Sequence, residues 1–130
     1  MTVVNVVNDV KRGKQRQRGR LSTDLERQMF TLLLAESSRG TITDLDLHPA
    51  PLSLAYKCTY TPDATCICGG RREYWEAKDY WVKKRDDGGW IKLKVAAQMF
   101  QDADFFLYER TKNRGIKIKM IPVLQTLEGV

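Results

Sequence analysis

The pattern of apolar and polar positions predicts a first helix from Thr23 to about Ser38. Thr23 and Glu26 have the spacing of a capping box, in which each side chain bonds a backbone N–H of the other. Apolar residues recur with helical spacing at Leu25, Met29, Leu32 and Leu33. Arg39 and Gly40 follow as a C-cap, so we expect the helix to end near Ser38.

The rest of the chain is predicted to form short strands and a second helix. β-Branched and aromatic residues, separated by Pro or Gly, indicate strands at residues 41–47, 52–61, 64–68, 72–81, 104–108 and 116–121. We expect a loop at residues 86–89 and a turn at residues 113–115. Residues 90–103 are predicted to be helical, with Ile91, Val95 and Met99, continued by Ala103, sharing one apolar face.

This order of elements predicts a single α/β (α+β) domain. The chain has 130 residues, of which 42% are hydrophobic, enough for one modest core. We assign the domain to residues 21–130 and a basic N-terminal arm to residues 1–20. Within the arm, residues 3–10 are β-branched and suit a strand added to the sheet edge of a neighbouring chain.

The net charge of +6 is concentrated in the arm. Between positions 11 and 20 the chain has no acidic residue and six basic ones, which are Lys11, Arg12, Lys14, Arg16, Arg18 and Arg20. Such a run buries nothing and is expected to be disordered in isolation. It is either a solubilising tail or an arm that binds phosphates. A second basic cluster favours polyanion binding, and it consists of Arg110, Lys112, Arg114, Lys117 and Lys119.

No feature of the sequence predicts export or membrane insertion. The N-terminus lacks a basic region followed by an apolar one, and no stretch approaches about 18 consecutive apolar residues. The three cysteines are an odd number and have no disulfide-framework spacing, which agrees with a reducing compartment. We therefore expect a cytosolic protein.

The strand at residues 72–81 places charged residues on one face. Because side chains alternate along a strand, Glu76 and Lys78 share one side, while Trp75 and Ala77 can pack on the other. An antiparallel hairpin turning at residues 68–71 would bring Asp63 close to Glu76. Two carboxylates and a backbone carbonyl make a hard-oxygen site suited to Mg²⁺, which can activate water for phosphodiester hydrolysis. An adjacent lysine can orient that water and stabilise the transition state.

These residues carry a resemblance to known nucleases. Pro62 and Asp63, followed by "EAK" at residues 76–78, resemble the signature of the PD-(D/E)xK nuclease superfamily. "TYTPD", with Glu26 in the helix before it and "FFLY" after a later helix, is similar to the phage endonuclease I type of Holliday junction resolvase. The resemblance covers residues 23 to 108 approximately. Ala64 departs from the pattern, since a larger apolar residue is common there.

The resemblance implies a fold, a cofactor and a site. The fold would be a restriction-endonuclease-like mixed sheet of about five strands flanked by helices. Asp63, Glu76 and Glu26 would be metal ligands and Lys78 the catalytic lysine. The metal would be Mg²⁺, with Mn²⁺ able to substitute. A homodimer is also implied, because resolving a junction needs two symmetric cuts.

Each of these residues also has a purely structural interpretation. Asp63 can be a turn residue, and Glu76 and Lys78 an exposed ion pair worth about 0.2–1 kcal/mol. Glu26 is explained by the capping box, by a metal site at the edge of the buried stripe, or by both.

The cysteines and the single histidine allow two interpretations. A zinc site would use Cys58, Cys66, Cys68 and His48, but their spacing lacks the usual C-x₂₋₄-C pair. The spacing favours small buried hydrophobes for the cysteines and a loop position for the histidine.

Two further basic segments also have alternative roles. Lys83, Lys84 and Arg85 form either a solvated hairpin tip or a loop that grips phosphates, with a neighbouring tryptophan stacking on an unpaired base. Lys117 and Lys119 alternate with apolar residues, as in an amphipathic edge strand whose lysines discourage aggregation.

The sequence therefore predicts a Mg²⁺-dependent DNA endonuclease that recognises shape and cleaves branched DNA such as a four-way junction in recombination or repair. Shape recognition is favoured because no base-reading module is visible. We expect a phage-encoded protein of the host cytoplasm, with no membrane partner and no small-molecule cofactor. One alternative is another PD-(D/E)xK nuclease acting in restriction, transposition or DNA-end processing. The other is a non-catalytic basic DNA-binding protein.

Overall fold

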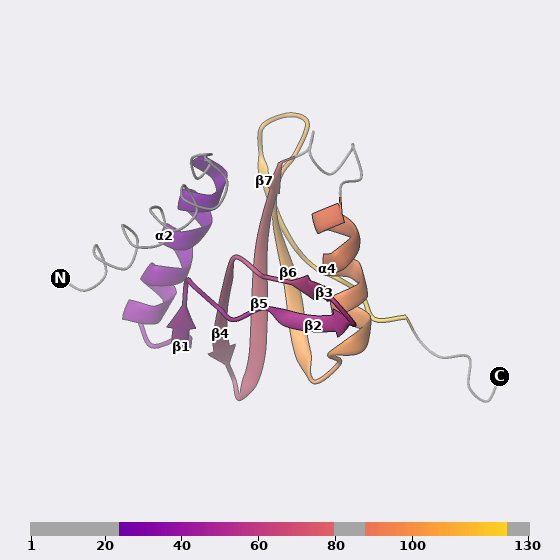
Figure 1. Cartoon of the computed structure of the whole chain (residues 1–130). Coiled ribbons are helices and arrows are strands. Elements are labelled where there is room, and N and C mark those ends of the chain that lie inside the picture. The colour runs from indigo at the N-terminus through magenta and orange to yellow at the C-terminus, as the bar shows by residue number, and fades with distance from the viewer. Residues whose placement is uncertain (1–23, 80–87, 125–130) are drawn as a thin grey trace.

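A computed structural model describes residues 24–79 and 88–124 of the chain. In these residues it shows a five-stranded mixed sheet, a separate two-stranded sheet and two helices (Figure 1). In chain order the elements are α2 (Asp24–Ser38), β1 (Thr43–Asp46), β2 (Leu52–Ala55), β3 (Cys58–Tyr60), β4 (Ala64–Cys68), β5 (Arg71–Asp79), α4 (Gly88–Met99), β6 (Ala103–Arg110) and β7 (Ile116–Met120). The predicted α+β class and the mixed sheet of five strands are confirmed. The arm at residues 1–20 lies outside the described residues.

Helix α2 forms where the sequence predicts it. Its buried residues include Leu25, Met29 and Leu33, which agrees with the apolar stripe. At its end, the N–H of Thr41 donates to the carbonyl of Glu36, and Gly40 adopts φ +81°. This is a Schellman C-cap, in which the residue with positive φ is most easily glycine. The predicted stop near Ser38 is confirmed, whereas the predicted N-cap, Thr23, lies outside the described residues.

The large sheet has the strand order β1-β4-β5-β6-β7. Strands β4 and β5 form an antiparallel hairpin through Gly69 and Gly70, whose φ values of 59° and 81° suit a tight two-residue turn. Strands β5 and β6 are parallel, so the chain between them must cross over, and α4 lies in that connection. All other neighbours in this sheet pair antiparallel.

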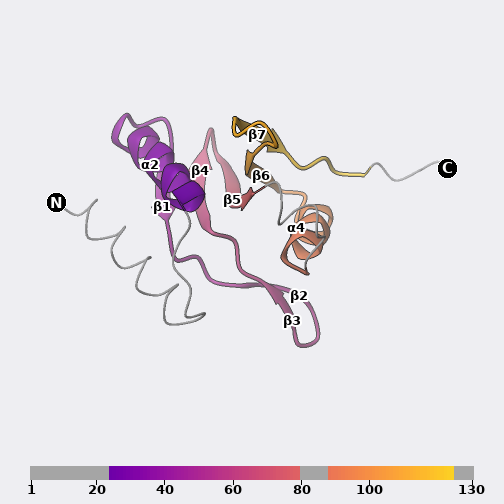
Figure 2. The same ribbon diagram turned by 90° about the horizontal axis from the view of Figure 1, so that it is seen from above.

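The sheet separates two hydrophobic clusters. On one face, α2 packs against residues that include Ala64, Cys66 and Trp75. On the other face, α4 packs against residues that include Phe105 and Leu107. Figure 2 shows the two helices on opposite sides of β5 and β6. We call these the α2 face and the α4 face of the sheet.

Aromatic pairs confirm the parallel register across β5 and β6. Trp75 stacks on Phe106 with ring centroids 4.8 Å apart, and Tyr74 stacks on Phe105 at 4.9 Å. The first pair lies on the α2 face and the second on the α4 face, as the alternation of a strand requires. Each such pair contributes about 0.5–1.5 kcal/mol beyond its buried area.

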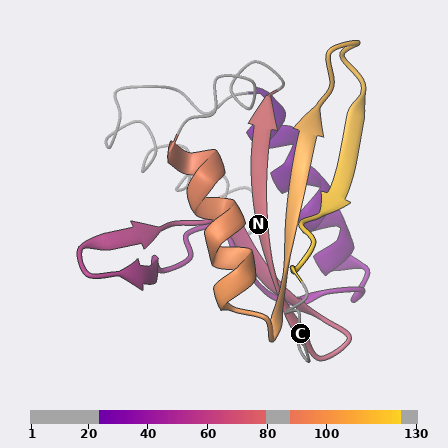
Figure 3. The ribbon, with the colours of Figure 1, turned by 90° about the vertical axis from the view of Figure 1, so that its right-hand side faces the viewer.

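The segment at residues 52–61 is not one strand but the hairpin of β2 and β3. Lys57, at the turn, has φ 57°, and the two strands form a sheet of their own. Leu52 and Leu54 of β2 and Tyr60 of β3 pack into the cluster of the α4 face. Figure 3 shows this hairpin beside α4, extending away from the large sheet.

The prediction for the second helix is wrong in its end and in its face. Helix α4 spans Gly88–Met99, and Ala103 already begins β6. It buries Leu93, Ala96 and Ala97, whereas the predicted stripe of Ile91, Val95 and Met99 is 44%, 41% and 49% exposed. Most positions of α4 other than its lysines are apolar, so periodicity could not select a face. The two alanines permit close approach to the sheet and the hairpin. The predicted loop at residues 86–89 is also partly wrong, because Gly88 and Gly89 are helical.

In the described part of the chain, neither helix combines the length and the apolar character that crossing a membrane requires.

Candidate functional site

Asp63 and Glu76 lie opposite each other on neighbouring segments. Ala64 pairs with Trp75 in the antiparallel ladder, and the N–H of Asp63 donates to the carbonyl of Trp75 at 3.0 Å. Because Ala64 and Trp75 both pack on the α2 face, the next residues, Asp63 and Glu76, point to the α4 face. The predicted hairpin register that brings the two carboxylates together is therefore confirmed.

Both carboxylates are nearly buried and hydrogen-bonded. Asp63 is 7% exposed, and its Oδ2 accepts the N–H of Ala77 at 2.9 Å. Glu76 is 8% exposed, and its Oε1 accepts the hydroxyl of Tyr60 at 2.5 Å. Lys78 lies on the same face, with its Nζ 3.6 Å from Oε2 of Glu76. The predicted surface shared by Glu76 and Lys78 is thus present, but it is largely buried rather than an exposed ion pair.

Tyr60 is a member of this site that the sequence did not single out. Burial raises the pKa of its phenol well above the ordinary 10.0, and the negative charge of Glu76, their hydrogen bond and the charge of Asp63 raise it further. The phenol therefore remains a hydrogen-bond donor at neutral pH. The available signal was its position three residues before Asp63, in the "TYTPD" segment already noted.

Glu109 is a second residue that was missed. It lies on β6, is 6% exposed, and in the parallel register pairs with Lys78 on the α4 face. Its partner in the register on β7 is Lys117, on the same face. A lysine thus flanks this carboxylate on each neighbouring strand. No local sequence pattern indicates this arrangement, because it depends on the order of the strands in the sheet.

Glu26 is not brought into the same group. It lies in the first turn of α2, is 8% exposed, and belongs to the helix that covers the α2 face, whereas Asp63 and Glu76 point to the α4 face. In residues 24–79 and 88–124, no three His, Cys, Asp or Glu side chains gather closely enough to hold a metal ion. Of the three predicted metal ligands, the structure therefore places only Asp63 and Glu76 on neighbouring segments.

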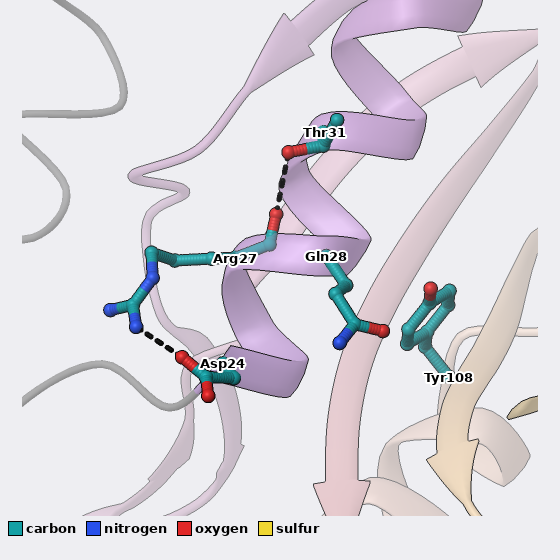
Figure 4. A pocket seen from close by; sticks show the side chains of 5 residues that line it. All are labelled: Asp24, Arg27, Gln28, Thr31 and Tyr108. Atoms are coloured by element: carbon teal, nitrogen blue, oxygen red, sulfur yellow. Dashed lines mark hydrogen bonds and ion pairs between the residues drawn. The ribbon is translucent and has the colours of Figure 1, made fainter. Parts of the chain in front are cut away.

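A separate open pocket of about 430 Å³ lies between α2 and β6 (Figure 4). It is lined by Asp24, Arg27, Gln28, Thr31 and Tyr108. Arg27 forms an ion pair with Asp24, and the hydroxyl of Thr31 donates to the carbonyl of Arg27 at 2.9 Å. Tyr108 belongs to the cluster of the α2 face, so this pocket is on the side of the sheet away from Asp63 and Glu76.

The cysteines and His48 are distributed over the structure. Cys66 is buried in the cluster of the α2 face, and its Sγ lies 3.4 Å from Oε1 of Glu73. Burial, followed by the charge of Glu73, raises the pKa of this thiol from 9.0 to about 12. Cys58 and Cys68 are half-buried and carry free thiols, and His48 is exposed.

None of the nine residues predicted to bind DNA is in the described part of the chain. The six basic residues of the arm, and Lys83, Lys84 and Arg85, lie outside the described residues. Lys117 and Lys119, which the alternation predicted to lie on an amphipathic edge strand, are on β7 at the edge of the sheet, and the register of β7 places both on the α4 face, the face that carries Glu76. Comparison with protein-family models, with curated proteins and with solved structures finds no match for this chain.

Proposed function

We propose that this protein is a Mg²⁺-dependent endodeoxyribonuclease. The observation that carries the proposal is the convergence of Asp63, Glu76 and Lys78 on one face of the sheet. These three charged groups come from two segments joined by a hairpin, and they are largely buried. Burying ionised groups costs desolvation free energy that pairing often does not repay, so the retention of these three groups in one place favours a chemical role.

The donor set fits a hard divalent cation. Carboxylate oxygens are the ligands that Mg²⁺ uses, and it commonly takes only one or two of them and keeps several waters. Asp63 and Glu76 would hold the cation, which would polarise the phosphoryl oxygen and generate the attacking hydroxide. Lys78, whose Nζ is 3.6 Å from Oε2 of Glu76, would place its positive charge beside the phosphate as negative charge builds on it.

Branched DNA is the substrate that we propose, cut by a homodimer that makes two symmetric incisions. The net charge of +6 and the basic arm support a polyanionic partner. Lys117 and Lys119, on the same face as the site, could contact the backbone near the scissile phosphate. The proposed setting is recombination or repair of phage DNA in the host cytoplasm.

The test is cleavage of a substrate panel in Mg²⁺: four-way junction, flap, linear duplex and single strand. Glu76→Gln and Lys78→Ala should each reduce junction cleavage by at least about 10²-fold and leave junction binding intact. Asp79→Asn is the matched control. Asp79 is one residue from Lys78 but points to the other face, where it is 3.5 Å from Arg110. Normal cleavage by either site variant would refute the assignment.

The same panel of DNA substrates distinguishes junction resolution from the alternative nuclease functions. Preference for linear duplex or for DNA ends would indicate restriction, transposition or end processing rather than junction resolution.

A non-catalytic DNA-binding protein is favoured by one observation. Among the described residues, no third carboxylate joins Asp63 and Glu76, so the pair with Lys78 could serve structure alone. Calorimetry with Mn²⁺ and Mg²⁺ distinguishes the two functions. A nuclease should bind the ion at a site that Asp63→Asn removes, whereas the binding protein should show no such site.

A further inference from the structure

We propose that Tyr60 is a positioning residue that orients Glu76 for metal binding. This inference rests on the proposed function, because Glu76 is there a ligand of the catalytic cation. Its basis is a buried hydrogen bond of 2.5 Å from the phenol hydroxyl to Oε1 of Glu76. A bond this short is typical of an O–H donor on a charged carboxylate.

The ring of Tyr60 is held by elements outside the large sheet. Tyr60 ends β3, is 4% exposed, and packs with Leu52 and Leu54 of the hairpin against α4. The hydroxyl thus reaches β5 from the β2–β3 hairpin, and the bond joins the hairpin to the site across sixteen positions of sequence. Figure 3 shows the hairpin beside α4 and the large sheet behind them.

The bond restricts how Glu76 can present its oxygens. The terminal torsion of a glutamate is broad, so an unsupported carboxylate samples many orientations. With Oε1 bound to Tyr60, the other oxygen, Oε2, lies on the side of Lys78 at 3.6 Å. The carboxylate therefore faces the catalytic lysine with a defined oxygen. Groups that hold a metal ligand in this way commonly contribute 10- to 100-fold in metal affinity or activity, as an order of magnitude.

A purely structural role for Tyr60 predicts something different. If the hydroxyl only stabilises the fold, its removal should lower the melting temperature and leave metal affinity unchanged. Tyr60→Phe keeps the packed ring and removes only the hydroxyl. Tyr74→Phe is the matched control, because Tyr74 is on the same face, stacks on Phe105, and makes no hydrogen bond through its hydroxyl within residues 24–79 and 88–124.

The experiment is a calorimetric titration of the full-length protein with Mn²⁺ in the absence of DNA, for wild type and both variants. Tyr60→Phe should weaken Mn²⁺ binding by about 10- to 100-fold, while Tyr74→Phe should bind as wild type does. In cleavage assays, raising the Mg²⁺ concentration should recover part of the rate lost by Tyr60→Phe.

Three outcomes overturn the inference, and they are distinguishable. If wild type binds Mn²⁺ and Tyr60→Phe binds it equally well, Tyr60 does not position Glu76, and the proposed nuclease is unaffected. If wild type binds no Mn²⁺, the proposal of a metal-dependent nuclease is wrong, and so is the proposed role of Tyr60. Should Tyr60→Phe not fold, fluorotyrosine incorporated at position 60 keeps the ring and makes a stronger donor. An Mn²⁺ affinity unchanged by that replacement would also overturn the inference.

Discussion

Replacing Leu93 tests which face of α4 is buried. Leu93 is fully buried in the cluster of the α4 face, whereas Ile91, two positions away, is 44% exposed. Removing a buried leucine side chain to alanine costs about 2–5 kcal/mol, from lost burial and the cavity left behind. We therefore expect Leu93→Ala to lower the free energy of unfolding by about 3 kcal/mol. Ile91→Ala should cost less than about 1 kcal/mol, because much of its side chain is already in water.

The size of this effect makes it easy to measure. An unfolding entropy of about 2.1 cal/mol/K per residue gives about 0.27 kcal/mol/K for 130 residues. A loss of about 3 kcal/mol then lowers the melting temperature by about 11 °C, out of a total stability of about 5–15 kcal/mol. Urea titrations followed by circular dichroism would measure the free energies directly. Equal losses in the two variants, or a larger loss for Ile91→Ala, would show that α4 is rotated relative to the structure described.

Two further predictions concern a buried thiol and the basic arm. Cys66 should resist iodoacetamide at pH 8 in the native state, because its thiol is buried and protonated. Its raised pKa stabilises the fold below about pH 9, and that contribution should be lost as the pH rises toward about 12. The free energy of unfolding should therefore fall more for wild type than for Cys66→Ala over this pH range. If it falls equally in the two proteins, the pKa of Cys66 is not raised. Deleting residues 1–20 should reduce the slope of log K against log salt for DNA binding by about 5, since the arm has six basic residues. A slope unchanged by the deletion would show that the arm does not contact phosphates.

Part of the candidate site could be predicted from local sequence patterns. Alternation along β5 correctly places Glu76 and Lys78 on one face, and the two glycines between β4 and β5 correctly indicate the hairpin that brings Asp63 beside them. These are local relations, set by the period of a strand and by turn chemistry. The chemical role of the group stays a prediction.

Three features could not be predicted from local sequence patterns, because each depends on how the elements pack. Periodicity could not orient α4, because apolar residues surround most of that helix and burial is decided by the surfaces it meets. The capping pattern located Glu26 at the start of α2, but whether α2 covers the same face as Glu76 depends on the path of the chain around the sheet. Tyr60 and Glu109 join the site through an isolated hairpin and a parallel neighbour strand.

Local chemistry along the chain thus indicates where most helices, strands and turns lie, since backbone preferences act over a few residues, but it missed both bounds of α4 and the turn within residues 52–61. It also specifies which side chains share a face within one strand. Contacts between distant segments are selected by the burial of apolar area over the whole domain, which no short stretch encodes. The hydrogen bond from Tyr60 to Glu76, the buried face of α4, and the position of Glu26 on the helix that covers the α2 face all depend on these contacts between distant segments.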